Sequence, residues 1–490
     1  MLPDHYAPRT TPFLHQVEAL EAGYRRTEFA YLLEMGLGKS RVLTDDFCLN
    51  YLNDTVEALC IIAPKSVYTN WSRVDDENPG ELQRWLWDGV REDVTIHLYR
   101  AGNRKGDVMS RLALMDNSRP GAKILIINVE ALAATNDAEI LVTKFLKQYR
   151  AMLAIDESTV IKSPKSLRTK ACLRIAPWAK QRRILTGKPS TGSNADYWAQ
   201  FEFLRPHNNL LGYRLFSMFR ARFCVMKEMF MGGRTIKVET GPQNIEELAN
   251  LVSHHSFRRT KKQCLDLPPK VYMRREVELT SEQDRVYREL KRSAMATLTN
   301  GHEVTTTLVM TQLMRMHQVI CGHVKTDEGL VMPIDNKRIA ALLEIIEATD
   351  EQIVIWACYR PDADIVTKNL RALYGDDAIA QWHGGRTQQE RDREEADFQA
   401  GRRRFMVATK AGSHGRTWTA GTCVIYYSND YSLEVREQSE DRTHRIGTVG
   451  TVTYWDLVCP GTVDEKIIRA LRAKHDITRA VLRDGIAAWI

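Results

Sequence analysis

Two short segments carry residue types that together could bind and hydrolyse a nucleoside triphosphate. Residues 36–40 read Gly-Leu-Gly-Lys-Ser, a turn that can offer backbone amides and one ammonium group to phosphate oxygens. Residues 153–158 read Leu-Ala-Ile-Asp-Glu-Ser, an apolar run that would deliver Asp156 and Glu157 to the edge of a sheet. Either segment alone is weak evidence, because glycine turns and acidic strand ends are common. In this order they indicate a phosphate-binding loop followed by a metal ligand and a general base.

These residues would divide the work of hydrolysis among them. The segment 34–40 should join a strand to a helix, so that its last amides lie at a helix N-terminus. Lys39 would contact the β- and γ-phosphates, and Ser40 would ligate Mg²⁺. Asp156 would bind the same ion, directly or through water, and Glu157 would orient and deprotonate the attacking water.

A second source of positive charge lies near the other end of the chain, in residues 436–447. We expect this segment to be a helix, so that Arg442 and Arg445, three positions apart, share one face. Two arginines on one face suit a γ-phosphate approached from a second lobe, as arginine fingers do. The alternative is a solvated helix face on which Glu440 and Asp441 pair with the arginines.

Short apolar, β-rich runs must position these groups. They alternate with helical patterns, which indicates parallel sheets covered by helices on both faces. The expected strands fall into two series, 58–63, 124–128, 152–155 and 183–185 in the first half and 353–357, 378–381, 405–408, 424–427 and 452–457 in the second.

The two series predict an α/β fold of two lobes. We expect the first lobe to span residues 1–266 and the second to span residues 267–490. Each lobe should carry a helical insertion, at about 205–262 in the first and about 281–330 in the second. A Leu-Pro-Pro-Lys step at 267–270 marks the break between them.

Composition narrows the class of protein. The chain has 490 residues, and its 69 Lys and Arg against 62 Asp and Glu give a net charge of +7, which is compatible with a polyanionic partner without requiring one. None of the nine cysteines forms a C-x-x-C pair, so zinc ribbons and disulfide frameworks are not expected. No signal peptide or run of 18 apolar residues is seen, so we expect no membrane contact and a cytoplasmic location, in the host if the chain is phage-encoded.

The motifs resemble, in type and order, those of Swi/Snf-type ATPases of helicase superfamily 2, over nearly the whole chain. An Arg-Arg-x-Lys and Leu-Pro-x-Lys signature at 258–261 and 267–270 is characteristic of the Swi/Snf-type branch. Further matches are 13–16 (Phe-Leu-His-Gln), 63–66 (Ala-Pro-Lys-Ser), 128–130 (Asn-Val-Glu), 185–187 (Leu-Thr-Gly), 382–385 (Trp-His-Gly-Gly), 408–415 (Ala-Thr-Lys-Ala-Gly-Ser-His-Gly) and 438–447.

The resemblance implies two RecA-like lobes with ATP and Mg²⁺ in the cleft between them. It implies catalytic roles for Glu157, Arg442 and Arg445. The residues that would bind the nucleotide are Gln16, which would read adenine, and Gly36, Gly38, Lys39, Ser40, Asp156 and Gln438, with Ser40 and Asp156 as metal ligands. Backbone contacts to nucleic acid would come from Lys65, Ser66, Thr409, Lys410 and Gly412.

Some positions depart from the family pattern. Lys188 stands where the family usually has threonine, Gly192 where it often has asparagine, and Thr448 where it usually has glutamine. These departures concern DNA contact and the coupling between lobes, and none removes a residue assigned to phosphate, metal or water.

The resulting expectation is a DNA-dependent ATPase that moves along DNA. We expect its substrate to be duplex DNA, bound without sequence preference, and the protein to be a compact motor of bacterial or phage type. The alternatives are a strand-separating DNA or RNA helicase and the motor subunit of a restriction or defence system. Five tryptophans could stack on bases, but we expect them to pack in the cores of the lobes: Trp71, Trp356, Trp382, Trp418 and Trp455.

Overall fold

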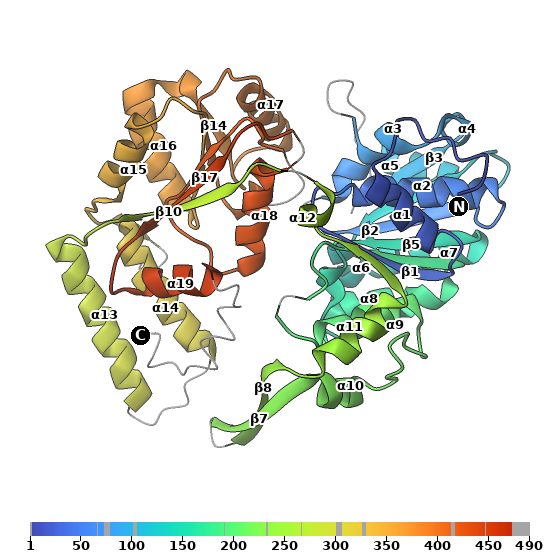
Figure 1. Ribbon diagram of the computed structural model, residues 1–490, viewed down its shortest axis with the longest axis horizontal. Coiled ribbons are helices and arrows are strands. Elements are labelled where there is room, and N and C mark those ends of the chain that lie inside the picture. The colour runs from blue at the N-terminus through green and yellow to red at the C-terminus, as the bar shows by residue number, and fades with distance from the viewer. Residues whose placement is uncertain are drawn as a thin grey trace. The chain divides into compact units, whose positions relative to one another are not determined.

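The computed structural model divides into two compact units (Figure 1). Unit 1 comprises Met1–Met226 and Gly241–Asp266, and unit 2 comprises Lys227–Thr240 and Leu267–Ile490. The structure describes residues 2–65, 67–72, 79–100, 105–190, 192–231, 234–265, 267–299, 306–325, 330–412, 417–445 and 447–472. No helix among these residues is both long enough and apolar enough to span a lipid bilayer.

Unit 1 is built on a parallel sheet of seven strands in the order β3-β4-β2-β5-β6-β1-β9. Its central strands are continuous apolar runs because both faces of the sheet are covered by helices. The strands are β1 (Glu28–Leu33), β2 (Ala58–Ala63), β3 (Thr95–Leu98), β4 (Lys123–Asn128), β5 (Ala151–Asp156), β6 (Gln181–Leu185) and β9 (Ser256–Arg259).

Two cores form on the two faces of this sheet, because successive side chains of a strand point to opposite sides. Along β2, Cys60 joins one core and Ile61 joins the other. One face is covered by α1 (Leu14–Gly23), α2 (Lys39–Leu52), α3 (Glu81–Trp85) and α4 (Asp88–Arg91). The opposite face is covered by α6 (Val129–Ala134), α7 (Asn136–Gln148), α8 (Leu167–Ile175), α9 (Asp196–Leu204), α10 (Phe216–Phe223) and α11 (Ile245–Ser253). The unit also contains α5 (Lys105–Leu114) and α12 (Lys261–Cys264).

Unit 2 repeats this plan with a parallel sheet of six strands in the order β10-β17-β16-β13-β15-β14. The strands are β10 (Lys270–Glu276), β13 (Ile353–Trp356), β14 (Ile379–Trp382), β15 (Phe405–Ala408), β16 (Cys423–Tyr426) and β17 (Val452–Val458). The helices are α13 (Ser281–Thr299), α14 (Thr306–Cys321), α15 (Arg338–Glu347), α16 (Arg360–Tyr374), α17 (Gln388–Gln399), α18 (Leu433–Thr443) and α19 (Val463–Arg472).

The predicted α/β class with two parallel sheets is confirmed. Each apolar run that predicted a strand falls on one, within two residues at either end. The strands of the two main sheets that the runs did not predict are β1, which the phosphate-loop pattern implied, and β3, β9 and β10. These last three are edge strands, and an edge strand does not need the continuous apolar sequence that a doubly covered strand needs.

The expected helical insertion at about 205–262 is wrong in part. It contains α10 and α11, but also β7 (Cys224–Met231) and β8 (Arg234–Pro242), which form a separate two-stranded sheet, and the main-sheet strand β9. The alternation Ile-Lys-Val-Glu at 236–239 after Gly-Gly at 232–233 is a hairpin pattern that was interpreted as mixed-charge helix. The segment at about 281–330 contains α13, α14 and β11 (His323–Lys325), which pairs with β12 (Val331–Pro333).

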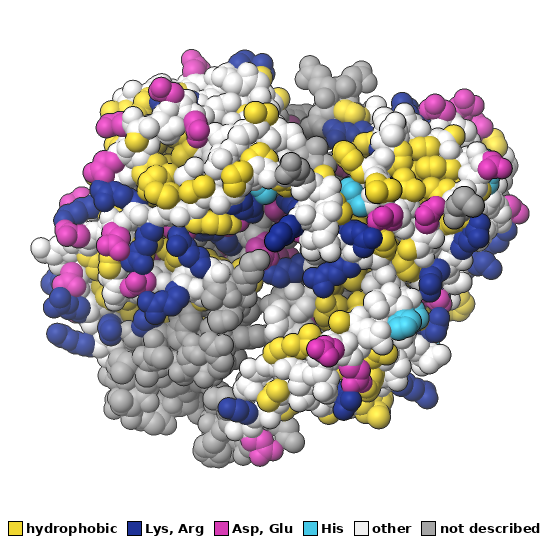
Figure 2. All heavy atoms as spheres, viewed as in Figure 1, with side chains coloured by type: hydrophobic (Ala, Val, Ile, Leu, Met, Phe, Trp, Pro, Cys, Tyr) yellow, Lys and Arg dark blue, Asp and Glu magenta, His cyan; other side chains and the backbone are white. Residues whose placement is uncertain are grey.

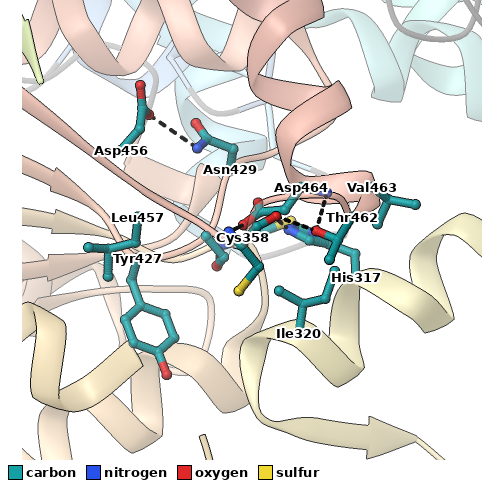
Figure 3. A network of polar contacts seen from close by, with 12 residues as sticks. His317, Ile320, Cys358, Tyr427, Asn429, Asp456, Leu457, Thr462, Val463 and Asp464 are labelled. Atoms are coloured by element: carbon teal, nitrogen blue, oxygen red, sulfur yellow. Dashed lines mark hydrogen bonds and ion pairs between the residues drawn. The ribbon is translucent and has the colours of Figure 1, made fainter. Parts of the chain in front are cut away.

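A buried ionic network joins the helices α14, α15 and α19 of unit 2 (Figure 3). Asp464, at the start of α19, is fully buried and contacts both the Arg338 guanidinium of α15 and Nε2 of His317 of α14, the latter at 3.5 Å. Burial favours the neutral acid, but Arg338 and His317 outweigh it and lower the pKa of Asp464. Figure 3 also shows Asn429 facing Asp456, to which it donates a 3.2 Å hydrogen bond.

Replacing Asp464 should therefore destabilise unit 2 strongly. Asp464→Asn leaves the buried Arg338 guanidinium without its counter-charge, which should lower the free energy of unfolding by about 3–5 kcal/mol. Urea unfolding followed by fluorescence measures this. The control is Asp284→Asn, which removes an exposed partner of Arg288 on α13 and should leave stability almost unchanged. Equal effects of the two substitutions would contradict the role of the network.

Candidate active site

The glycine-rich turn lies between β1 and α2, as its sequence predicts. Gly36 and Gly38 have φ angles of 84° and 82°. This left-handed conformation is unfavourable for any residue that carries a side chain. A Cβ on Gly38 would also lie 2.2 Å from Nε2 of Gln16. Lys39 is the first residue of α2, with Ser40 beside it, so the free amides of the helix N-terminus lie at the turn. This is an anion-binding geometry.

Gln16 and His15 of α1 hold the turn in place. Oε1 of Gln16 accepts from the Phe13 amide at 3.1 Å, and its Nε2 donates to the Leu37 carbonyl oxygen at 3.2 Å. Nε2 of His15 lies 3.0 Å from the same carbonyl oxygen. The structure thus brings Gln16 to the phosphate loop, and its reading of adenine stays a prediction.

The acidic pair lies at the same edge of the sheet as the turn. Strand β5 ends at Asp156, and β1, which leads into the turn, is separated from β5 by β6 alone. The Lys39 Nζ and Glu157 Oε1 atoms are 3.2 Å apart, and both side chains are mostly buried. Glu157 has a left-handed backbone with φ of 50°, which is uncommon for a residue other than glycine. Residues far apart in the sequence therefore form one charged cluster.

Asp156 sits in a nearly closed environment. Its Oδ2 accepts a 3.1 Å hydrogen bond from the Trp71 indole, and its Oδ1 accepts from the Glu157 amide at 3.0 Å. Burial and then the Glu157 carboxylate raise the pKa of Asp156, against the opposing effects of Lys39 and Trp71. A cation bound beside these two neighbouring carboxylates would offset their mutual repulsion.

Trp71 is a site residue that the sequence interpretation assigned to core packing. It is buried, as expected, but its N–H also orients Asp156. The available signal was that a buried indole nitrogen normally needs an acceptor.

The oxygen donors at this edge fit Mg²⁺. The Ser40 hydroxyl group and the Asp156 carboxylate are the hard ligands that this ion prefers, and it commonly completes its shell with water and phosphate oxygens. In the part of the chain that the structure describes, no group of three or more His, Cys, Asp or Glu side chains could hold a metal ion by itself.

The second cationic segment differs from its prediction. Helix α18 ends at Thr443, and His444 has non-helical angles (φ −106°, ψ 83°), so Arg442 lies in the helix and Arg445 lies beyond it. The expectation that the two arginines share one helix face is wrong. The Thr448 hydroxyl group accepts from the Arg445 amide at 3.0 Å and contacts the Thr443 and Arg445 carbonyl oxygens, hydrogen bonds that compete with another helical turn.

Each arginine has a partner within unit 2. Arg442 is 1% exposed, and its Nε donates to the Gln438 carbonyl oxygen at 2.9 Å. Arg445 is half-buried, and its Nη1 donates to Thr417 Oγ1 at 2.8 Å. Gln438 is buried and donates to Glu434 at 3.2 Å. Their contacts with nucleotide stay predictions.

Glu440 anchors α18 to the edge of the sheet. Its carboxylate accepts from Lys270 Nζ at 2.9 Å and from the Tyr272 hydroxyl group at 2.8 Å, both on β10, and from Arg436 Nε at 2.9 Å. Burial alone would raise the pKa of Glu440, but Lys270 and Arg436 outweigh it and lower the pKa to about 2. The anchor fixes the helix that carries Arg442.

The residues predicted to contact nucleic acid follow strands in both units. Lys65, after β2, is exposed, and its amide donates to Glu130 Oε2 at 3.0 Å. Thr409 and Lys410 follow β15, and Lys410 is exposed. Gly412 is buried, since a Cβ there would lie 2.5 Å from the Trp418 ring. Ser66 lies outside the described residues.

Positive and negative side chains are mixed on the surface, as the modest net charge would suggest. Figure 2 shows Lys and Arg side chains on both units, interspersed with Asp and Glu on the face in view.

Family models match two long stretches of the chain. The model of the SNF2-related domain matches residues 25–325, and that of the helicase conserved C-terminal domain matches residues 337–447. The first stretch contains Lys39 and Glu157, and the second contains Arg442 and Arg445.

Relatives match the chain over most of its length. The DNA annealing helicase and endonuclease ZRANB3 of Bos taurus is 24% identical over 489 residues, which cover 98% of this chain and 41% of the relative. The putative ATP-dependent helicase/translocase YwqA of Bacillus subtilis (strain 168) is 24% identical over 440 residues, which cover 86% of this chain and 43% of the relative. The chain thus spans less than half the length of these relatives. The solved Sulfolobus solfataricus SWI2/SNF2 ATPase core in complex with dsDNA aligns over 100% of this chain and 96% of that chain, with 21% identity and a TM-score of 0.43.

A side chain at Gly38 should disable the phosphate loop. Gly38→Ala places a methyl group against the Gln16 amide and should weaken binding of a fluorescent ATP analogue by about 10-fold or more. The control is Gly375→Ala in unit 2, where φ is also positive (80°) but an added Cβ would meet nothing within 4 Å, so this variant should bind normally. Normal binding by Gly38→Ala would contradict the assigned geometry.

Loss of the Glu440 carboxylate should change how stability depends on pH. The folded-state pKa lies below the usual value of 4.5, so the carboxylate stabilises the fold above about pH 4.5 and loses this effect as the pH falls towards 2. Glu440→Gln should therefore cost about 3 kcal/mol at pH 7 and much less near pH 3. Urea unfolding at both pH values measures the difference.

The exposed Glu347 of α15 provides a control for this measurement, since Glu347→Gln should leave stability unchanged at both pH values. A cost of Glu440→Gln that is the same at pH 7 and pH 3 would contradict the ionic anchor.

Proposed function

Because the chain belongs to the SNF2-related family, the Swi/Snf-type branch of helicase superfamily 2, we propose that it hydrolyses ATP and uses the reaction to move along DNA. The observation that supports this most directly is the 3.2 Å contact between Lys39 of the phosphate loop and Glu157 at the end of β5. It joins the two halves of a hydrolytic site that the sequence holds far apart.

Residues of unit 1 would bind and orient the substrate. The amides at the start of α2 and the Lys39 ammonium group would receive the phosphates, and Gln16 would contact adenine. Ser40 and Asp156 would hold Mg²⁺, which when bound offsets the negative charge of the phosphates. The Trp71 hydrogen bond would keep the Asp156 carboxylate turned towards this position.

Glu157 would act as the general base. Its carboxylate is paired with Lys39 in the structure. Phosphate oxygens that attract Lys39 would weaken this pair and leave Glu157 to orient a water molecule and accept its proton. The site would therefore develop its base as the substrate binds.

Unit 2 would supply Arg442 and Arg445 to the γ-phosphate. Neither unit contains all the groups that hydrolysis needs, so a conformation that joins the arginines to the phosphate would be favoured by ATP and lost after hydrolysis. To reach a phosphate, Arg442 would exchange its hydrogen bond to the Gln438 carbonyl oxygen for a charged acceptor.

DNA would be held through its phosphates. Lys65 and Lys410 are exposed at the ends of strands in the two units, where they could contact a backbone without reading bases. We therefore propose binding that is independent of sequence, sensitive to salt and directed mostly to duplex DNA. The name of one relative, a DNA annealing helicase and endonuclease, supports DNA as the partner.

A strand-separating helicase on DNA or RNA and a restriction-system motor are the competing proposals. Strong unwinding of a forked substrate would favour the helicase. Co-purification of a nuclease would favour the restriction motor.

Steady-state ATPase assays with duplex DNA, single-stranded DNA, RNA or no nucleic acid test the proposal. Duplex DNA should stimulate hydrolysis, and added salt should reduce the stimulation. Glu157→Gln should still bind ATP but turn over at least about 100-fold more slowly, because the base is lost. The control is Glu139→Gln on α7. It removes the ion pair of Glu139 with Arg174 of α8 and should keep full activity. Near-normal turnover by Glu157→Gln would refute the base assignment, and stimulation by RNA alone would refute DNA as the substrate.

A further inference from the structure

One buried polar side chain outside the recognised motifs joins three segments of unit 1. Gln200 of α9 is 0% exposed. Its Oε1 accepts from the Ser158 hydroxyl group at 2.7 Å, and its Nε2 donates to the carbonyl oxygens of Pro189 at 2.6 Å and Asp196 at 2.8 Å. The amide thus has partners at both its oxygen and its nitrogen.

The first of these partners lies in the turn that follows Glu157. Ser158 follows Glu157 directly, is fully buried and begins a short 3₁₀ turn, Ser158–Ile161. Glu157 has a left-handed φ of 50°, and such a backbone persists only where the surroundings hold it. The hydrogen bond from Ser158 to Gln200 is a contact on the residue next to this strained position.

The second partner belongs to the turn after β6, which touches the phosphate loop. In this turn Thr186 Oγ1 accepts from the Lys188 amide at 3.1 Å. A Cβ on Gly187 would lie 2.8 Å from the Met35 backbone nitrogen, so the turn and the phosphate loop are in close backbone contact. Gln200 therefore connects the turn with Glu157 to a turn that packs on the phosphate loop.

The amide of Gln200 is a polar group in an apolar setting. The neighbouring residues of α9 form an apolar core, including Trp198, Phe201 and Phe203. An apolar side chain of the same length would fill the volume but would leave the buried Ser158 hydroxyl group and the Pro189 carbonyl oxygen without these partners. The amide instead fixes two turns at adjacent strand ends, β5 and β6, beside the Lys39–Glu157 pair.

We propose that Gln200 is a positioning residue for Glu157, acting through Ser158 and tying the Glu157 turn to the phosphate loop through Pro189. The inference rests on the proposed hydrolysis of ATP. A displaced base affects the chemical step more than binding of the nucleotide, so loss of Gln200 should lower kcat and leave KM for ATP nearly unchanged.

The test is Gln200→Met, which keeps the length of the side chain and removes the amide. We expect kcat for duplex-stimulated ATP hydrolysis to fall about 10- to 100-fold, with KM and the affinity for a fluorescent ATP analogue within about threefold of wild type.

The matched control is Gln283→Met in unit 2. Gln283 is 1% exposed, accepts from the Thr280 amide and donates to the carbonyl oxygens of Val319 and Ile320, so its amide has a comparable set of bonds but touches neither the Glu157 turn nor the phosphate loop. Gln283→Met should lower the urea unfolding midpoint and leave kcat unchanged. A Gln200→Met protein that is less stable but retains wild-type kcat would overturn the proposal.

Ser158→Ala provides a second variant with a smaller change in packing. If Gln200 acts through Ser158, the double variant Ser158→Ala/Gln200→Met should be no slower than the slower single variant. Effects on kcat that multiply would overturn this route, and normal kcat in Ser158→Ala would do so even if Gln200→Met failed to fold.

A wild-type chain that binds ATP without hydrolysing it under any condition would refute the proposed function itself, whereas an active wild type with unaffected variants would refute this inference alone.

Discussion

The ion pair between Lys39 and Glu157 is the interaction on which the proposed chemistry depends. Removing an ammonium group and a carboxylate from water is costly, and the attraction between them offsets this cost only at close range. The parallel sheet provides that range, because it brings the carboxyl ends of β1 and β5 to one edge with β6 between them. A phosphate that competes for Lys39 would act on an ion pair whose carboxylate belongs to a residue with a left-handed backbone, Glu157.

Side chains outside the charged pair restrict the conformations of the residues that form the site. Trp71 fixes Asp156 from one side, and Gln200 fixes the residue after Glu157 from the other. In unit 2, Glu440 plays a comparable part by tying α18 to β10 through Lys270. In each case a buried polar group has found its partners, and such networks restrict a site to one arrangement more effectively than apolar packing does.

Elements with a strong local sequence pattern could be predicted from the sequence. Elements whose conformation depends on contacts with distant residues could not. Apolar runs predicted the doubly covered strands, and the motif order predicted the family, which the family models confirm. The edge strands β3, β9 and β10 lack that signal because most of their side chains are half-buried or exposed and need not be apolar. Arg445 was misplaced because the hydrogen bonds of Thr448 override helix propensity. Gln200 gives no local signal for its role, since its partner beside Glu157, Ser158, lies 42 residues away in the chain.

The burial of Arg442 has a consequence for how ATP could regulate the proposed motor. A guanidinium group that is 1% exposed has already lost most of its water, and its Nε has a neutral carbonyl partner. Exchange of that partner for a phosphate oxygen would replace a neutral acceptor with a negatively charged one at little further desolvation cost. Hydrolysis would remove the acceptor and make the carbonyl competitive again. A modest difference between two acceptors could thus bias the arginine in alternation, which is the property that a cyclic motor requires.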